Sequence, residues 1–390
     1  MKKHLEHLSR AKLAALYQVM TAVAVVTALI VYFQSSFLKT LIGEQYIGAF
    51  FSVSYALTLL AIFLFPALLK KAGTKNTLLG LLAALMTALA VLAFGTPKFQ
   101  LIALVIYEML IALIGVNLDV FIETFSRDSM TGRIRGRAYT YMNIAWVLTP
   151  AISGWMASKY GFLVLFASAF LVIVPFIVLV LVKFKHEKTE FNHQPPLKKI
   201  LRDLWKNTAL LKIFYISFLL SFFYAWMIIY TPLYLVKIGF EPYEIGRIFS
   251  VMLLPFVLLQ YPAGWLADKI FGEKEIITFG ILTLSLATIS LYFISSPSIL
   301  LWILLLFLTR VGASLIEIMR DTYFFKQIDF RDIHLTSLFR NTTSLAHVIA
   351  PLVATLALQF YHLEMKALFL VLGGICLTGL FASLTLKDTK

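Results

Sequence analysis

Two apolar stretches of the sequence, residues 99–125 and 298–322, carry ionisable side chains on a helical period. The side chains are Glu108, Asp119 and Glu123 in the first stretch, and Arg310, Glu317 and Asp321 in the second. At 100° per residue, each set of three falls on one face of a helix. Ionisable groups inside an apolar segment are costly, and they indicate a pathway for ions or polar solutes, or ion pairs between helices.

Glu108 and Arg310 lie near the middle of their stretches. A carboxyl group can take up and release a proton, and a guanidinium can hold a carboxylate or a phosphate. We therefore expect Glu108 to carry a coupling proton and Arg310 to bind a substrate or keep Glu108 charged; the alternative is a fixed ion pair that joins two helices. Four polar or aromatic side chains are further candidates for the pathway: Gln34, Asn143, Trp226 and Tyr230.

The remaining ionisable residues of both stretches lie toward one end, close to basic residues. Glu123 precedes Arg127 by four positions, a spacing that allows an ion pair on a helix. We expect a network of ion pairs that closes one side of the protein, and direct contact with a substrate is the alternative. Its members are Asp119, Glu123, Arg127, Glu317, Arg320 and Asp321.

The elements that position these residues are membrane-spanning helices. The chain has 390 residues, of which 60% are hydrophobic and only 14% are charged, whereas a soluble domain has about 25% charged residues. Apolar stretches of about 20 residues, enough to cross a bilayer, recur twelve times. They lie at residues 14–34, 46–69, 75–95, 99–125, 135–158, 161–183, 209–235, 243–267, 275–295, 298–322, 334–359 and 363–386.

The basic residues orient these spans. Most Lys and Arg residues fall at the two termini, in the central linker and in alternate loops, so the positive-inside rule places both termini in the cytoplasm. The same bias accounts for the net charge of +14 without a nucleic-acid partner.

The chain also contains an internal repeat. "IGAFFSV" at residues 47–53 returns as "IGRIFSV" at residues 245–251, and the same offset places Tyr32 on Tyr230 and Lys71 on Lys269. We therefore expect two parallel copies of a six-helix unit around a central cavity, because six spans preserve orientation.

The expected divisions are residues 1–184, a cytoplasmic linker at 185–207, and residues 208–390. After Pro196 the linker reads as an amphipathic helix that lies on anionic lipid, or as a solvated helix that touches neighbouring loops.

A loop motif resembles that of one transporter family. "GWLADKIFGEK" keeps Gly264, Asp268 and Lys269, and "PALLKKAGTK" in the first half keeps Lys71 and Gly73. With twelve spans in two parallel halves, the chain is similar to the major facilitator superfamily. The resemblance implies that these five residues belong to a cytoplasmic gate and that the first, fourth, seventh and tenth helices line the cavity.

The expected function is secondary active transport of a small molecule across the cytoplasmic membrane by rocker-switch alternating access, coupled to protons. The alternatives are an uncoupled facilitator, a transporter-like sensor and a membrane enzyme. No nucleophile, zinc or phosphate-binding motif is present, so we expect neither catalysis nor a metal or other cofactor. The expected partners are the substrate, protons and lipid, and the expected state is a monomer.

Overall fold

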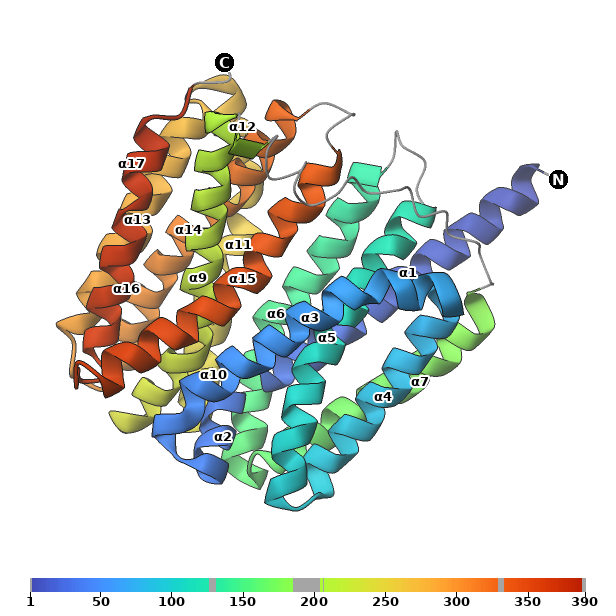
Figure 1. The fold of residues 1–390 in the computed structure, drawn as a ribbon, viewed down its shortest axis with the longest axis horizontal. Helices are drawn as coiled ribbons and strands as arrows, with labels where there is room; N and C mark the ends of the chain where they lie inside the picture. Colours follow the sequence, from blue (N-terminus) through green and yellow to red (C-terminus); the bar gives the residue numbers. More distant parts are fainter. Residues whose placement is uncertain (1, 126–130, 185–203, 206, 329–332, 388–390) are drawn as a thin grey trace. The chain divides into compact units, whose positions relative to one another are not determined.

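The structure is a computed structural model that describes residues 2–125, 131–184, 204–205, 207–328 and 333–387 (Figure 1). Every regular element in these ranges is a helix. Arg127 and nearly all of the predicted linker at 185–207 lie outside the described residues, as do the side chains of Glu123 and Asp268.

The chain divides into two compact units. Unit 1 comprises Met1–Gly43 and Ser54–Phe191, and unit 2 comprises Glu44–Val53 and Asn192–Lys390. The short segment Glu44–Val53 therefore belongs to unit 2 although it lies early in the sequence.

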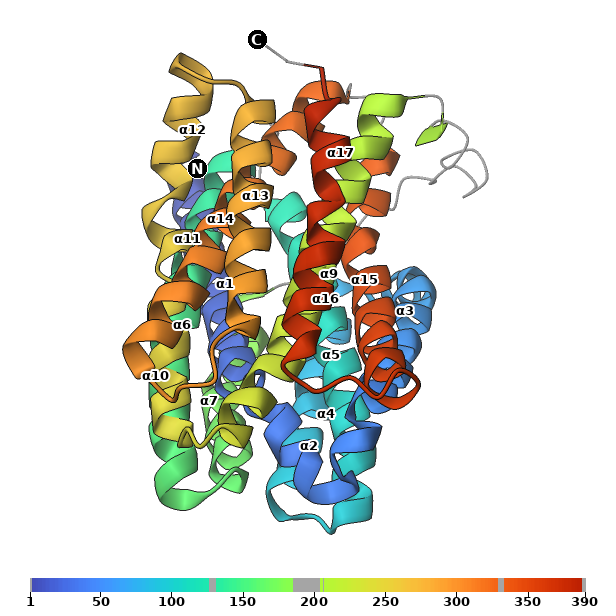
Figure 2. The ribbon, with the colours of Figure 1, turned by 90° about the vertical axis from the view of Figure 1, so that its left-hand side faces the viewer.

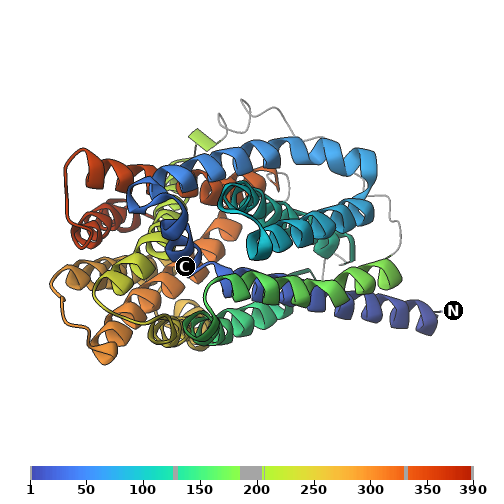
Figure 3. The same ribbon diagram turned by 90° about the horizontal axis from the view of Figure 1, so that it is seen from below.

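Unit 1 is built from long helices that pack side by side. They are α1 (Lys2–Ile30), α2 (Gln34–Ile42), α3 (Ile47–Ala72, of which Ile47–Val53 belong to unit 2), α4 (Thr74–Phe94), α5 (Pro97–Phe125), α6 (Thr131–Tyr160) and α7 (Leu163–Lys183). Helix α1 packs against α5, α6 and α7, and α4 packs against α5 and α7. Figure 3 shows α1 and α7 running alongside each other.

Unit 2 repeats this plan. Its helices are α9 (Thr208–Lys237), α10 (Pro242–Met252), α11 (Pro255–Leu258), α12 (Gln260–Lys269), α13 (Glu273–Tyr292), α14 (Ile299–Gln327), α15 (Ile333–Gln359), α16 (Ala367–Leu377) and α17 (Gly379–Leu384), and η1 (Glu44–Tyr46) precedes α3. Helix α9 packs against α14, α15 and the α16–α17 pair, and α13 packs against α14 and that same pair (Figure 2). Each of these pairings has its counterpart in unit 1, which is what a duplicated six-helix unit requires.

Eleven segments of the described chain are long and apolar enough to cross a membrane. Helix α6 is the twelfth long helical segment and is not among the eleven, because its first turns carry arginines and its middle is rich in polar and small residues. The predicted all-α, multi-span membrane architecture is confirmed.

Three predicted spans are interrupted helices, and one of them, residues 363–386, is divided at Thr378 into α16 and α17. The break in residues 243–267 has a clear cause, since Pro255 has no N–H to continue α10 and its ring clashes with the preceding turn. The break in residues 14–34 separates α1 from α2 at residues 31–33, where the sequence has neither proline nor glycine. It places Gln34 at the start of a new helix.

Candidate transport site

Glu108 lies in a group of polar side chains inside unit 1. Gln34 at the start of α2, Tyr55 of α3 and Tyr107 of α5 all lie close enough to Glu108 to interact with it, and Thr27 of α1 lies beside Tyr107. We call these five residues the Glu108 cluster. Four helices supply them, so the packing of α1, α2, α3 and α5 determines its geometry.

Several buried polar atoms of the Glu108 cluster make no hydrogen bond of standard geometry with a described residue. They are Oε1 of Glu108, both terminal atoms of the Gln34 amide and Oη of Tyr107. Gln34 and Tyr107 are each only 2% exposed. A buried polar atom without a partner costs roughly 1–3 kcal/mol, so several in one place suit a site that receives a proton or a polar ligand.

Arg310 lies in unit 2 against aromatic rings of α9. Its guanidinium carbon is 5.0 Å from the centre of the Phe223 ring and 5.9 Å from that of Tyr224, and the residue is 3% exposed. Rings at this distance stabilise a cation through their quadrupole. Arg310 is therefore held at a fixed place within unit 2.

Two other charged residues of α14, Glu317 and Arg320, also bond to α9. Glu317 accepts a hydrogen bond of 2.8 Å from Oη of Tyr224. Arg320 donates to Oγ of Ser217 at 3.0 Å and to Oδ1 of Asp321 at 3.1 Å. The polar face predicted for this span thus joins two helices of the same unit.

Trp226 and Tyr230 lie inside unit 2 in a row of rings along α9. The Trp226 ring centre is 5.5 Å from that of Phe222 and 5.9 Å from that of Tyr230. Both residues are at most 3% exposed, and Oη of Tyr230 donates to the Pro351 carbonyl at 3.3 Å. Nε1 of Trp226 is buried without a hydrogen-bond partner among the described residues.

The remaining predicted site residues are spread over several helices. Asn143 of α6 and Asp119 of α5 are half-buried, and Lys71 and Lys269 are exposed at the ends of α3 and α12. Gly73 ends α3 with a φ of 78°, a left-handed conformation that glycine adopts without strain, while its N–H bonds to the Leu69 carbonyl at 2.9 Å. Gly264 lies within α12 with open space where a Cβ would be.

A cavity of about 470 Å³ lies in unit 1 among α1, α6 and α7. Its walls are mostly apolar, with hydroxyl-bearing side chains from Thr21, Tyr141, Thr149 and Ser168. Ligand pockets commonly measure about 300–1,000 Å³, so its volume suits a small molecule, and none of the predicted pathway residues lines it.

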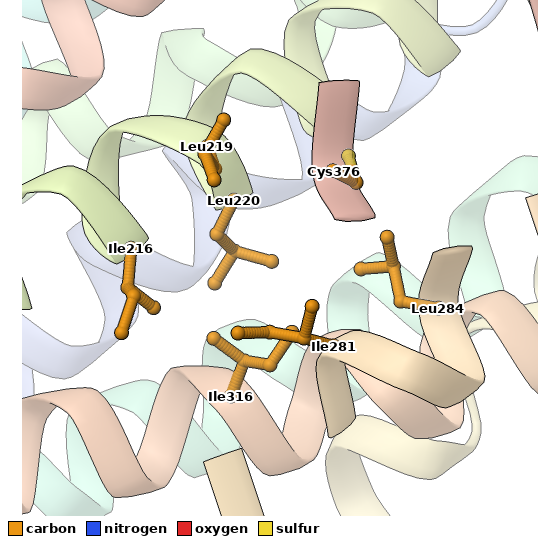
Figure 4. Close-up of a pocket in the computed structure, with 7 residues that line it drawn as sticks. All are labelled: Ile216, Leu219, Leu220, Ile281, Leu284, Ile316 and Cys376. Carbon is orange, nitrogen blue, oxygen red and sulfur yellow. The ribbon is translucent and has the colours of Figure 1, made fainter. Parts of the chain in front are cut away.

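A second void lies in unit 2 and is lined by apolar side chains and Cys376 (Figure 4). Its volume is about 10 Å³, which is no larger than one water molecule. A dry void of that size is a packing defect and not a substrate site.

Tyr107 and Ser217 were not among the predicted site residues. The sequence offered only weak signals for them: Tyr107 adjoins Glu108, and Ser217 lies on a helix expected to face the cavity. Which aromatic residue bonds to which carboxylate depends on the packing of two helices.

Comparison with known families settles the classification. The profile of the Major Facilitator Superfamily matches residues 13–331 and, in a second match, residues 238–390. The chain belongs to this superfamily. The predicted family and the predicted fold are therefore both confirmed, and the protein is a multi-pass membrane protein. No curated protein matches the chain significantly.

Two solved structures of transporters share the fold. A point mutant of the nucleoside transporter NupG superposes with a TM-score of 0.77 at 13% identity, covering 96% of this chain and 99% of its own. The peptide transporter POT, in complex with sulfate, superposes with a TM-score of 0.76 at 14% identity, covering 96% of this chain and 93% of its own. Identities this low establish the fold and leave the substrate open.

Proposed function

We propose that the protein is a secondary active transporter that moves a polar small molecule across the cytoplasmic membrane and couples this movement to protons. Membership of a transporter superfamily supports transport. The observation that carries the coupling is Glu108, a half-buried residue whose Oε1 is buried without a hydrogen bond of standard geometry to a described residue.

Glu108 is the proton carrier in this proposal. A charged carboxylate in a dry interior is unfavourable unless it is paired or hydrogen-bonded, and protonation removes the charge. Protonated Glu108 is stable in a site closed to water. Charged Glu108 favours a conformation in which the site is open to water on one side of the membrane. Alternating access follows if the two halves, residues 1–184 and 208–390, rock about the substrate with both termini in the cytoplasm.

Arg310 contributes to substrate binding in this proposal. Its guanidinium is fixed against Phe223 and Tyr224, and a guanidinium held in one place can bind a carboxylate or phosphate with two parallel hydrogen bonds. The charged residues of α14 nearer its C-terminal end, Glu317, Arg320 and Asp321, belong to the cytoplasmic gate. The bonds of Glu317 and Arg320 to α9 make that part of unit 2 rigid.

The test is Glu108→Gln in proteoliposomes. A thermal-shift screen against polar metabolites first identifies a substrate, because a ligand of the folded state raises its stability. We expect Glu108→Gln to lose accumulation driven by a pH gradient while exchange of labelled substrate continues.

The matched control is Glu364→Gln, whose side chain is 74% exposed; it should accumulate substrate normally. Accumulation by Glu108→Gln that equals the wild type would reject proton coupling at Glu108. A wild type that equilibrates substrate without responding to the pH gradient would instead identify an uncoupled facilitator.

A further inference from the structure

Gln34 occupies an unusual position for an amide side chain. It begins α2 immediately after the break at residues 31–33, it is 2% exposed, and it lies beside Glu108. Neither Nε2 nor Oε1 of its amide makes a hydrogen bond of standard geometry with a described residue, although the amide lies close enough to interact with Glu108. A buried amide group is unfavourable unless its NH₂ group and its oxygen are both hydrogen-bonded.

We propose that Gln34 is the positioning residue for proton transfer at Glu108: its amide donates a hydrogen bond to the charged carboxylate and, after rotating, accepts one from the protonated carboxyl. This inference rests on the proposed function, since it assumes that Glu108 changes its protonation state during transport.

The chemistry of the amide fits this role. Glutamine carries one acceptor oxygen and a donor NH₂ group on the same carbon, so rotation about its last side-chain torsion exchanges them. A carboxylate only accepts, and a protonated carboxyl can donate. Glutamine can therefore satisfy Glu108 in both protonation states. Methionine and leucine have no such donor and acceptor, and the serine hydroxyl is on a shorter side chain.

Few other groups can take over this role. The titratable groups that act on Glu108 are Tyr55 and Tyr107. Among the helices packed on α5, α2 has Lys39, α4 has Lys75 as its sole charged residue, and α6 has none between Tyr141 and Lys159. The part of α1 after Tyr17 carries no ionisable side chain. The groups that act on Glu108 include neither Lys39 nor Lys75.

The position of Gln34 connects the protonation state of Glu108 to the backbone of α2. Because α2 begins at Gln34, a change in the hydrogen bond to Glu108 acts on the first turn of α2. The serines that follow, Ser35 and Ser36, are also buried, and their hydroxyls have no partner among the described residues. This end of α2 is therefore held by few polar contacts, and the state of Glu108 can shift its orientation.

The experiment compares Gln34→Met with Gln18→Met, whose glutamine lies exposed on α1. Coupled uptake is measured in proteoliposomes as a function of pH. Methionine keeps the length and removes both hydrogen bonds. Because the bond to the charged form is the stronger of the two, its loss favours protonation, and the midpoint pH should rise by about one unit. Gln18→Met should keep the wild-type midpoint.

A second variant, Gln34→Glu, keeps the polarity and tests the same idea if methionine disturbs folding. Two adjacent carboxyl groups share one proton, so the midpoint should move upward by more than in Gln34→Met. Retention of the wild-type midpoint in both variants, with Glu108→Gln uncoupled, would overturn the role of Gln34 and leave the proposed function standing. Full coupling in Glu108→Gln would overturn the proposed function itself.

Discussion

Among single residues, Tyr224 and Glu317 show how unit 2 satisfies a half-buried carboxyl group. Tyr224→Phe removes only the hydroxyl that donates to Glu317 and leaves the carboxylate short of one donor. We expect a loss of about 1–3 kcal/mol in the free energy of unfolding, seen as a lower melting temperature in detergent. The control is Tyr361→Phe, in the loop between α15 and α16: its side chain is 76% exposed, so the loss should be smaller. Equal losses in the free energy of unfolding would show that the hydrogen bond to Glu317 does not stabilise the fold.

Among the helices, α3 approaches α9 and α15 closely because Gly48 lies at its start. A Cβ at this position would overlap the hydroxyls of Tyr230 and Thr355 and would lie 2.8 Å from the Pro351 carbonyl oxygen. Alanine in place of a helical glycine normally stabilises by about 0.5–1 kcal/mol, but overpacking costs about 1–3 kcal/mol. We therefore expect Gly48→Ala to lower the melting temperature.

The matched change is Gly80→Ala in α4, where open space surrounds the new methyl group. Gly80→Ala should leave the melting temperature unchanged or raise it. A Gly48→Ala protein as stable as Gly80→Ala would mean that α3 does not pack tightly on α9 and α15. The same contact explains why Glu44–Val53 belongs to unit 2, and a further bond supports it, from Nε2 of Gln359 to the carbonyl of Gln45 at 2.5 Å.

For the molecule as a whole, the predicted topology is open to a direct test. The sole cysteine, Cys376, is buried against an apolar void, so Cys376→Ala is preferable to a serine whose hydroxyl would lack a partner. Single cysteines then replace Ser9 or the exposed Ser296. An impermeant thiol reagent added to intact cells should label position 296 and spare position 9 until the cells are lysed. Labelling of position 9 alone would invert the orientation.

The class of the protein could be predicted from its sequence alone. Span length, the low share of charged residues and the repeat of residues 47–53 at 245–251 are local or periodic properties, and they predict a duplicated, all-helical membrane transporter fold without knowledge of any contact. Glu108 and Arg310 could be chosen in the same way, because an ionisable residue in an apolar span is conspicuous wherever its neighbours lie.

Which groups meet could be learned only from the packing of the helices. Gln34 comes to lie beside Glu108 because α1 ends at residue 30, although no proline or glycine announces that break. Tyr224 meets Glu317, and Glu44–Val53 joins unit 2, through packing between helices far apart in the sequence. Hydropathy along the sequence shows whether a residue is surrounded by lipid, protein or water. Which side chains contact each other depends on how two helices are rotated and how deeply each is inserted. The periodicity of a single helix does not contain that information.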